Sequence, residues 1–183
     1  MTTVNELKDQ RRRLMALSRA YKSQMYGAAP GAAPEGFHAL KCVDEARMWL
    51  GKIIFAIERD ANKDTIDAYA ESVDPTNDVI APTVDPPSQE KIHTIIDQTI
   101  QLGLIGSIKF IRKELDSIYM TIDRLSMTPD FKDWLEENAE IDNETLDYPI
   151  GYICLLQIRI SLVTAKMWFG GMLEKIQINQ SKF

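Results

Sequence analysis

The sequence predicts an all-α protein: two tandem antiparallel helical hairpins packed into a bundle, with several chains assembled into an oligomer. Three observations lead to this prediction. Apolar residues recur every three or four positions through most of the 183 residues, as on the buried face of a helix. A tryptophan-centred phrase occurs twice, as ARMWLG at 46–51 and as AKMWFG at 165–170. An acidic, proline-rich segment separates the two occurrences.

The N-terminal hairpin is predicted to occupy residues 1–63. Its first helix runs from Val4 to Tyr26, and the glycines and prolines that follow it form the turn. Its second helix runs from Glu35 to Ala61 and is apolar nearly all round in its second half, which indicates burial on several sides. The first helix places five apolar residues on one side: Leu7, Leu14, Leu17, Tyr21 and Met25.

An extended connector is predicted at residues 64–88, because this segment lacks helical periodicity and contains several prolines and no basic residue. The C-terminal hairpin, with a short extra helix, is predicted at 89–183. Its first helix runs from Ser88 to Ser126 and its last from Asp147 to Ile178, with the short helix beginning at Pro129. The first of these helices contains two glycines that mark a kink or a close helix contact, Gly103 and Gly106.

The repeated phrase has an architectural explanation. Alanine and glycine allow a facing helix to approach closely, while tryptophan and methionine supply large apolar surfaces. One hairpin has too little core of its own to bury so much apolar surface. We therefore expect two similar hairpins that pair face to face, within the chain or between chains, with Trp49 and Trp168 as scaffold residues.

Composition and charge restrict the classes of function. The net charge of −6 argues against binding to duplex nucleic acid, which normally requires a large basic surface. The two cysteines and the two histidines are far apart and show no metal-ligand spacing, so neither a disulfide framework, a metal site nor a cofactor is expected. The N-terminal segment is polar and no long uncharged apolar run occurs, so we expect a cytoplasmic protein outside the membrane.

The stretch HALKCVDEARMWLGKIIFAIERD at 38–60 resembles the second helix of the small hairpin domain in phage anti-CBASS and anti-Thoeris sponge proteins. The segment at 67–85 is similar to the tail that follows this hairpin in phage proteins. In the second half of the chain the resemblance extends only to AKMWFG. The matching positions are Ala39, Leu40, Asp44, Glu45, Ala46, Met48, Trp49 and Arg59.

This resemblance implies a function and a location. Sponges of this family sequester cyclic nucleotide messengers of bacterial immune systems without cleaving them, so the chain would be a non-enzymatic phage protein in the cytoplasm of an infected host. They assemble as oligomers, often hexamers, and bind the ligand between protomers. This chain departs from the compact members in two ways: it lacks their polar, aromatic segment before the first helix, and it carries a second half that they lack.

A cyclic nucleotide requires cations for its phosphates and flat groups for its bases. The first predicted helix offers both on the side opposite its apolar stripe, and the resemblance adds the terminal arginine of the second helix. A solvated outer face is the alternative interpretation of this basic stripe. The candidate ligand-binding residues are Lys8, Arg12, Arg19, Lys22, Tyr26 and Arg59, with Arg112, Lys113 and Tyr119 as weaker counterparts in the second half.

Two other functions remain open from the sequence. The same hairpins would serve a structural protein that only oligomerises or docks a protein partner. A magnesium-dependent nucleotide pyrophosphohydrolase is the least favoured, although Glu136–Glu140 fits EExxE and Glu144–Asp147 fits ExxD. These two motifs are four residues apart rather than on separate facing helices, so an acidic helix end explains them better.

Overall fold

The computed structural model describes residues 2–25, 33–61, 94, 102–137 and 150–180. Within this part of the chain all regular structure is helical, and no strand occurs. The elements are α1 (Thr2–Met25), α2 (Ala33–Ala61), α5 (Gly103–Ser126), α6 (Pro129–Glu137) and α7 (Ile150–Gln180). The predicted all-α fold is confirmed.

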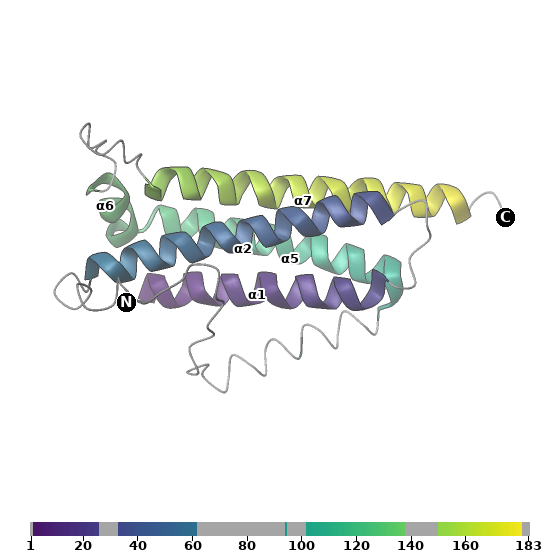
Figure 1. Ribbon diagram of the computed structural model, residues 1–183, viewed down its shortest axis with the longest axis horizontal. Coiled ribbons are helices and arrows are strands. Elements are labelled where there is room, and N and C mark those ends of the chain that lie inside the picture. The colour runs from purple at the N-terminus through teal and green to yellow at the C-terminus, as the bar shows by residue number, and fades with distance from the viewer. Residues whose placement is uncertain (1, 26–32, 62–93, 95–101, 138–149, 181–183) are drawn as a thin grey trace, which may run out of the picture.

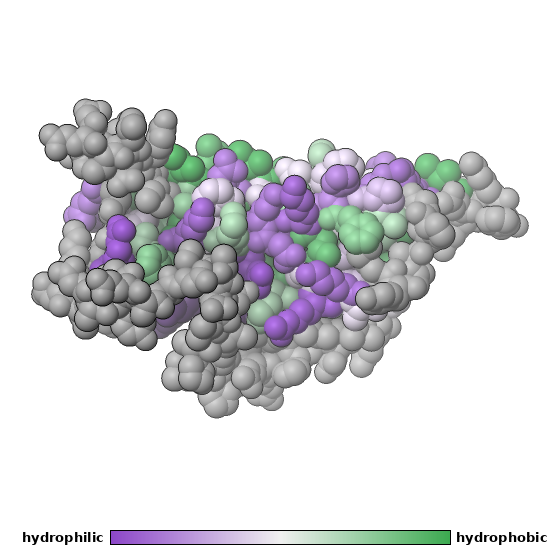
Figure 2. All heavy atoms as spheres, in the orientation of Figure 1, coloured by the Kyte–Doolittle hydropathy of each residue, from purple (hydrophilic) through white to green (hydrophobic). Residues whose placement is uncertain are grey.

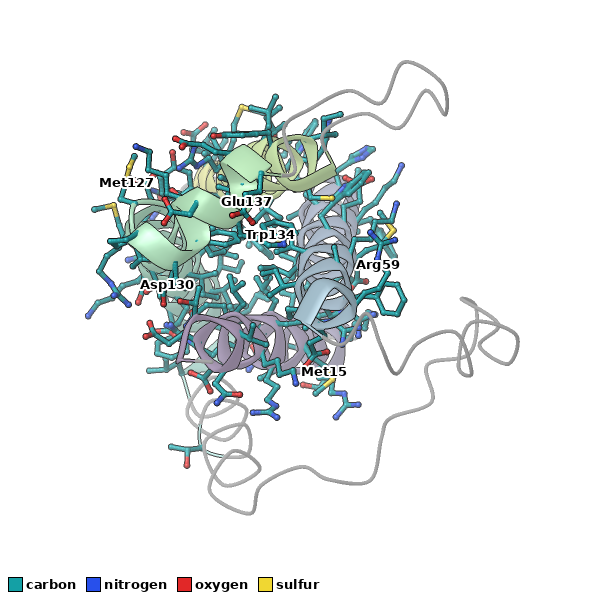
Figure 3. All side chains as sticks on the ribbon, turned by 90° about the vertical axis from the view of Figure 1, so that its left-hand side faces the viewer. Met15, Arg59, Met127, Asp130, Trp134 and Glu137 are labelled. Atoms are coloured by element: carbon teal, nitrogen blue, oxygen red, sulfur yellow. The ribbon has the colours of Figure 1, made fainter. Side chains whose placement is uncertain are left out.

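The four long helices form a bundle with a closed order of neighbours (Figures 1 and 3). Helix α1 packs beside α2, α2 beside α7, α7 beside α5, and α5 beside α1, and the contact between α2 and α7 is the most extensive. Every neighbouring pair is antiparallel, so α1 runs in the same direction as α7, and α2 in the same direction as α5 (Figure 1). The chain thus contains two antiparallel hairpins, α1–α2 and α5–α7, packed face to face as the sequence predicts.

One continuous core fills the centre of the bundle, and Tyr21 joins its two halves. This tyrosine of α1 is fully buried and lies edge-on to Phe169 of α7, with 5.0 Å between ring centroids. Its hydroxyl donates a hydrogen bond of 3.0 Å to the sulfur of Met172. Burial raises the pKa of Tyr21 to about 12, so the hydroxyl keeps its proton and acts as a donor at all physiological pH values.

The two copies of the tryptophan phrase have the same orientation in the bundle. Their alanines, Ala46 and Ala165, are completely buried at the packed side of α2 and α7. The residues that follow tryptophan, Leu50 and Phe169, are buried as well, whereas the methionines that precede it are exposed. Since the same positions point inward in both hairpins, the phrase marks equivalent structural positions.

A second shared pattern lies in the first helix of each hairpin, where LKDQRRRL at 7–14 matches IKFIRKEL at 108–115. Its arginine lies against the glycine of the tryptophan phrase in both hairpins. A Cβ atom at Gly51 would come within 3.2 Å of Arg11 Nε, and one at Gly170 within 3.6 Å of Arg112 Nη2. The repeat therefore includes both helices of each hairpin, which supports a duplication.

The predicted single helix over 88–126 is wrong at Gly103. This residue has a φ of +64°, in the left-handed region that glycine adopts without strain, and α5 begins there. A Cβ atom at Gly106 would lie 2.8 Å from Cβ of Leu102, so this glycine makes room for the turn that precedes the helix. Most of the residues N-terminal to this turn, and the predicted connector at 64–88, lie outside the described residues.

Helix α6 forms after Thr128 as predicted and packs across one end of the bundle (Figure 1). Proline at its first position costs no hydrogen bond, since the first amides of a helix have no intrahelical acceptor. Phe131 and Leu135 are buried, and Trp134 stacks on Phe131 and points toward the centre of the bundle (Figure 3). Gly151 at the start of α7 lies against Trp134 and Leu135, since a Cβ atom there would come within 2.8 Å of both side chains.

Truncation of Leu50 tests the assignment of the phrase to the core. The change Leu50→Ala removes a fully buried side chain, and we expect it to lower the free energy of unfolding by about 2–5 kcal/mol. The change Met48→Ala, two residues away at a position that is 47% exposed, should alter it by no more than about 0.5 kcal/mol. Urea denaturation followed by circular dichroism measures both values, and equal effects would contradict the orientation described.

Candidate functional site

Two hollows lie along α2 in the described part of the molecule. The first, of about 460 Å³, is formed at the side of α2 that faces α1 and contains both acidic and basic side chains. The second, of about 350 Å³, lies between the end of α2 and the start of α7. We refer to the second as the aromatic–cation hollow, and its lining consists of Trp49, Lys52, Phe55, Ala56, Arg59, Ile153 and Cys154.

The aromatic–cation hollow combines ring surfaces with positive charge. Lys52, Phe55 and Arg59 follow one another at helical spacing along one side of α2. The ammonium group of Lys52 lies 4.1 Å from the ring centroid of Trp49. Phe55 is 61% exposed, which is unusual for an aromatic side chain. Among the described residues that line this hollow there are two cations, Lys52 and Arg59, and no carboxylate.

The opposite wall of the aromatic–cation hollow comes from α7. Cys154 is buried there, and burial raises the pKa of its thiol, an effect that the charge of Lys52 only partly offsets. The group is therefore an uncharged thiol at neutral pH and serves as an apolar wall. Ile153 beside it continues this surface. A flat, negatively charged molecule matches such a lining, because it gains ring contacts and charge contacts together.

The larger hollow next to α1 has a different charge balance. Its cations already have carboxylate partners: Lys22 lies 3.4 Å from Asp44, and Lys41 lies 3.8 Å from Glu45. Ser18 also donates a hydrogen bond of 3.1 Å to Asp44. Two basic and two acidic side chains thus compensate one another in this lining, which gives an anion little electrostatic advantage.

The structure distributes the sequence-predicted ligand residues over several places. Lys8 forms an ion pair of 2.5 Å with Glu58 of α2, and Lys22 lines the hollow next to α1. Arg12 is half-buried and Arg19 is exposed on α1, while Tyr26 lies outside the described residues.

Arg59 alone of this predicted set lines the aromatic–cation hollow. Asp44, the partner of Lys22, lies about 22 Å from Arg59 along α2 at the rise of an α-helix. The residues predicted to act together therefore do not form one compact site.

The weaker candidates of the second half have other surroundings. Arg112 packs against Gly170, and its Nε atom is buried, so its structural counterpart is Arg11. Lys113 is exposed, and Tyr119 packs against the core. The true counterpart of the aromatic–cation hollow follows from aligning the two tryptophan phrases, and its α7 positions are Trp168, Gly171, Glu174, Lys175 and Ile178.

This counterpart is partly covered by side chains of the protein itself. His38 stacks on Trp168 with 4.8 Å between ring centroids and 27° between ring planes. Lys175 donates a hydrogen bond to Glu35, a buried residue in the first turn of α2. That hydrogen bond is the main reason why the pKa of Glu35 lies below its usual value. Of two equivalent positions, one therefore has its tryptophan stacked against His38 and its lysine paired with Glu35, whereas in the other Lys52, Phe55 and Arg59 are exposed.

Other chemistry has little support in the described residues. No group of three or more histidine, cysteine or acidic side chains in this part of the chain is arranged to hold a metal ion. Glu136 and Glu137 are exposed at the end of α6, where Glu136 pairs with Lys132 at 3.4 Å. The remaining residues of the two acidic motifs, from Glu140 to Asp147, lie outside the described residues.

Comparisons with protein-family models, with curated proteins and with solved structures give no match for this chain. The candidate site therefore rests on its own geometry.

Sequence reasoning named Arg59 and missed Lys52 and Phe55. A signal for them exists. After the shared glycine, the first copy reads Lys52, Phe55 and Arg59 at positions where the second copy has glycine, glutamate and isoleucine. A divergence between two copies that otherwise keep their buried positions indicates a role outside the core. This difference can be recognised only after the two tryptophan phrases have been aligned as equivalent positions.

Loss of Lys175, which pairs with Glu35, should make the free energy of unfolding depend less on pH. The lowered pKa of Glu35 stabilises the fold fully above the ordinary value of 4.5, and this contribution disappears as the pH falls through the lower value of the folded state. We expect Lys175→Met to be less stable than wild type at pH 7, with a difference that narrows from about pH 4.5 downward.

Unfolding free energies measured between pH 3 and pH 7 provide the test. Lys132→Met is the control, since its partner Glu136 lies on an exposed helix surface. A Lys175→Met deficit of constant size across this range would show that Lys175 acts through packing rather than through Glu35.

Proposed function

We propose that the protein is a non-enzymatic binding protein that sequesters a cyclic nucleotide-type signalling molecule, as a phage immune-evasion sponge would. The observation that carries this proposal is the aromatic–cation hollow, in which Trp49 and Phe55 offer ring surfaces beside Lys52 and Arg59. The resemblance of residues 38–60 to phage sponge proteins supports the same class of ligand.

The size and chemistry of the hollow suit part of a cyclic nucleotide. A volume of about 350 Å³ is in the range of small-molecule sites, roughly 300–1,000 Å³. Stacking of a base on an aromatic side chain contributes about 1–3 kcal/mol. Hydrogen bonds from Lys52 and Arg59 to a phosphate contribute about 1.5–3 kcal/mol each. One base and its adjoining phosphate would enter the hollow, while the rest of the cyclic nucleotide would remain at the opening of the hollow.

Sequestration without cleavage follows from the lining of the hollow. The described residues of this lining include no carboxylate or histidine to act as a general base. The thiol of Cys154 is buried and carries a raised pKa, so it is a poor nucleophile. A molecule held between these side chains would be retained intact and released intact.

A structural role is the second candidate, and one observation favours it. Helix α7 presents a row of exposed apolar residues to solvent, among them Leu156 and Val163. A protein that only assembles or docks a partner needs such a surface and no small-molecule hollow. The two functions predict different results in a binding experiment.

Calorimetric titration with cyclic dinucleotides, cyclic trinucleotides and cyclic ADP-ribose isomers tests the proposed function. We expect one of these compounds to bind and to be recovered unchanged by mass analysis. The double change Lys52→Ala with Arg59→Ala should weaken binding by about 10²- to 10⁴-fold, since two charged contacts are lost. Phe55→Ala should weaken it about tenfold or more through lost stacking.

The control is the double change Arg12→Ala with Arg19→Ala, which removes two cations of α1 that do not line the hollow. We expect it to leave affinity within about twofold of wild type. Loss of binding in this control alone would move the site to the basic face of α1. The absence of heat with every compound would leave the structural role as the better account.

A further inference from the structure

Helix α7 carries an exposed apolar row on the side opposite to the core. Its members are spaced by three or four residues and therefore lie within one narrow sector of the helix. We call this row the α7 stripe; its members are 42–64% exposed and comprise Tyr152, Leu156, Ile160, Val163 and Met167. Figure 2 shows hydrophobic side chains along the upper edge of the molecule, where α7 runs.

The charged residues that border the α7 stripe are neutralised within the chain. Arg159 pairs with Asp123 of α5 and also donates a hydrogen bond of 3.0 Å to Ser126. Lys166 pairs with Asp116 of α5 at 2.5 Å. Between these two aspartates Met120 is 65% exposed and extends the apolar surface toward α5.

Length and composition alone would allow α7 to cross a membrane. A window in Gly151–Ile178 has a mean hydropathy of 1.3, and 39% of that window is buried inside the bundle. The buried side contacts α2 and α5, so the apolar character of α7 has two separate causes. One side belongs to the core, and the other is the α7 stripe.

We infer that the α7 stripe is the interface with a second copy of this chain, with the two α7 helices antiparallel across a two-fold axis near Ile160. The intervals between successive members of the α7 stripe are almost the same when the helix is followed in either direction. Such a pairing sets Tyr152 opposite Met167 of the second copy and Leu156 opposite Val163 of the second copy. A surface that complements itself in this way is what a two-fold interface requires, and aromatic–methionine contact is favourable.

The extent and charge of the surface support a second copy as the occupant. Monomeric proteins rarely expose long contiguous apolar patches, and such patches mark interaction sites. The α7 stripe continues over five exposed members, from Tyr152 to Met167. A lipid surface would be recognised by basic residues beside the apolar ones, and here the bordering cations are already paired while the chain carries a net charge of −6.

Sedimentation analysis over a range of concentrations tests this inference independently of any ligand. We expect wild type to reach twice the chain mass of 20.8 kDa, and Leu156→Glu with Val163→Glu to remain at the single-chain mass with an unchanged helical spectrum. The matched control is Phe37→Glu with Met48→Glu, which alters two similarly exposed apolar residues of α2 and should leave the dimer intact.

Cross-linking checks the position of the axis. In a Cys42→Ser background, oxidised Ile160→Cys should form a disulfide-linked dimer, because residues near a two-fold axis meet their own copies. Phe37→Cys in the same background should not. Three results would overturn the inference: a single-chain mass of wild type at all concentrations, equal dissociation by the α2 control, or stripe-dependent binding to phosphatidylglycerol-containing vesicles without self-association.

Discussion

The close contact between α2 and α7 is the constraint on which the rest of the structure depends. Both helices carry a completely buried alanine in the repeated phrase, Ala46 and Ala165, and small residues allow helix backbones to approach. Helices α1 and α5 pack against this pair and complete one core. The edge contact of Tyr21 with Phe169 is an example of their joining, since it spans from the first helix to the last.

Each hairpin alone would expose half of this core to water. The arginine that lies against glycine in both hairpins, Arg11 on Gly51 and Arg112 on Gly170, fixes the first helix of each pair on the second. The alkyl stems of such arginines cover apolar surface while their charged ends remain near water. The same two devices, repeated, explain why the two halves of the chain keep similar buried positions although few of their exposed residues agree.

Helical periodicity was sufficient to predict the fold class, the order of the helices and the short helix after Thr128. It was not sufficient at Gly103, because a glycine in a left-handed turn and a glycine inside a helix look alike in a periodic pattern. The shared pattern of the first helices was also missed, since LKDQRRRL and IKFIRKEL become comparable only after the register of α5 is known.

Of the residues that line the candidate site, only Arg59 was predicted from the sequence. Arg59 was named because the resemblance to sponge proteins implies an arginine at the end of the second helix, whereas Trp49 was assigned to the scaffold alone. In the structure Trp49 serves two purposes, since it packs against the core and also carries Lys52 on its ring. Periodicity reports which side of a helix is buried, and it does not report where the edge of that side meets a neighbouring helix to form a hollow.

The ion pair between Glu35 and Lys175 has a consequence for stoichiometry. A symmetric dimer of identical hairpins must present its ligand positions in equal pairs. A chain that contains both hairpins is free to cover one position and keep the other, so under the proposed function it would offer one ligand position for every two hairpins. The pair of Glu35 and Lys175 then contributes stability above the ordinary pKa of Glu35, and the exposed residues of the open position, Lys52, Phe55 and Arg59, can change with little effect on the fold. Fusion of two hairpins into one chain thus allows a division of labour that identical subunits do not have.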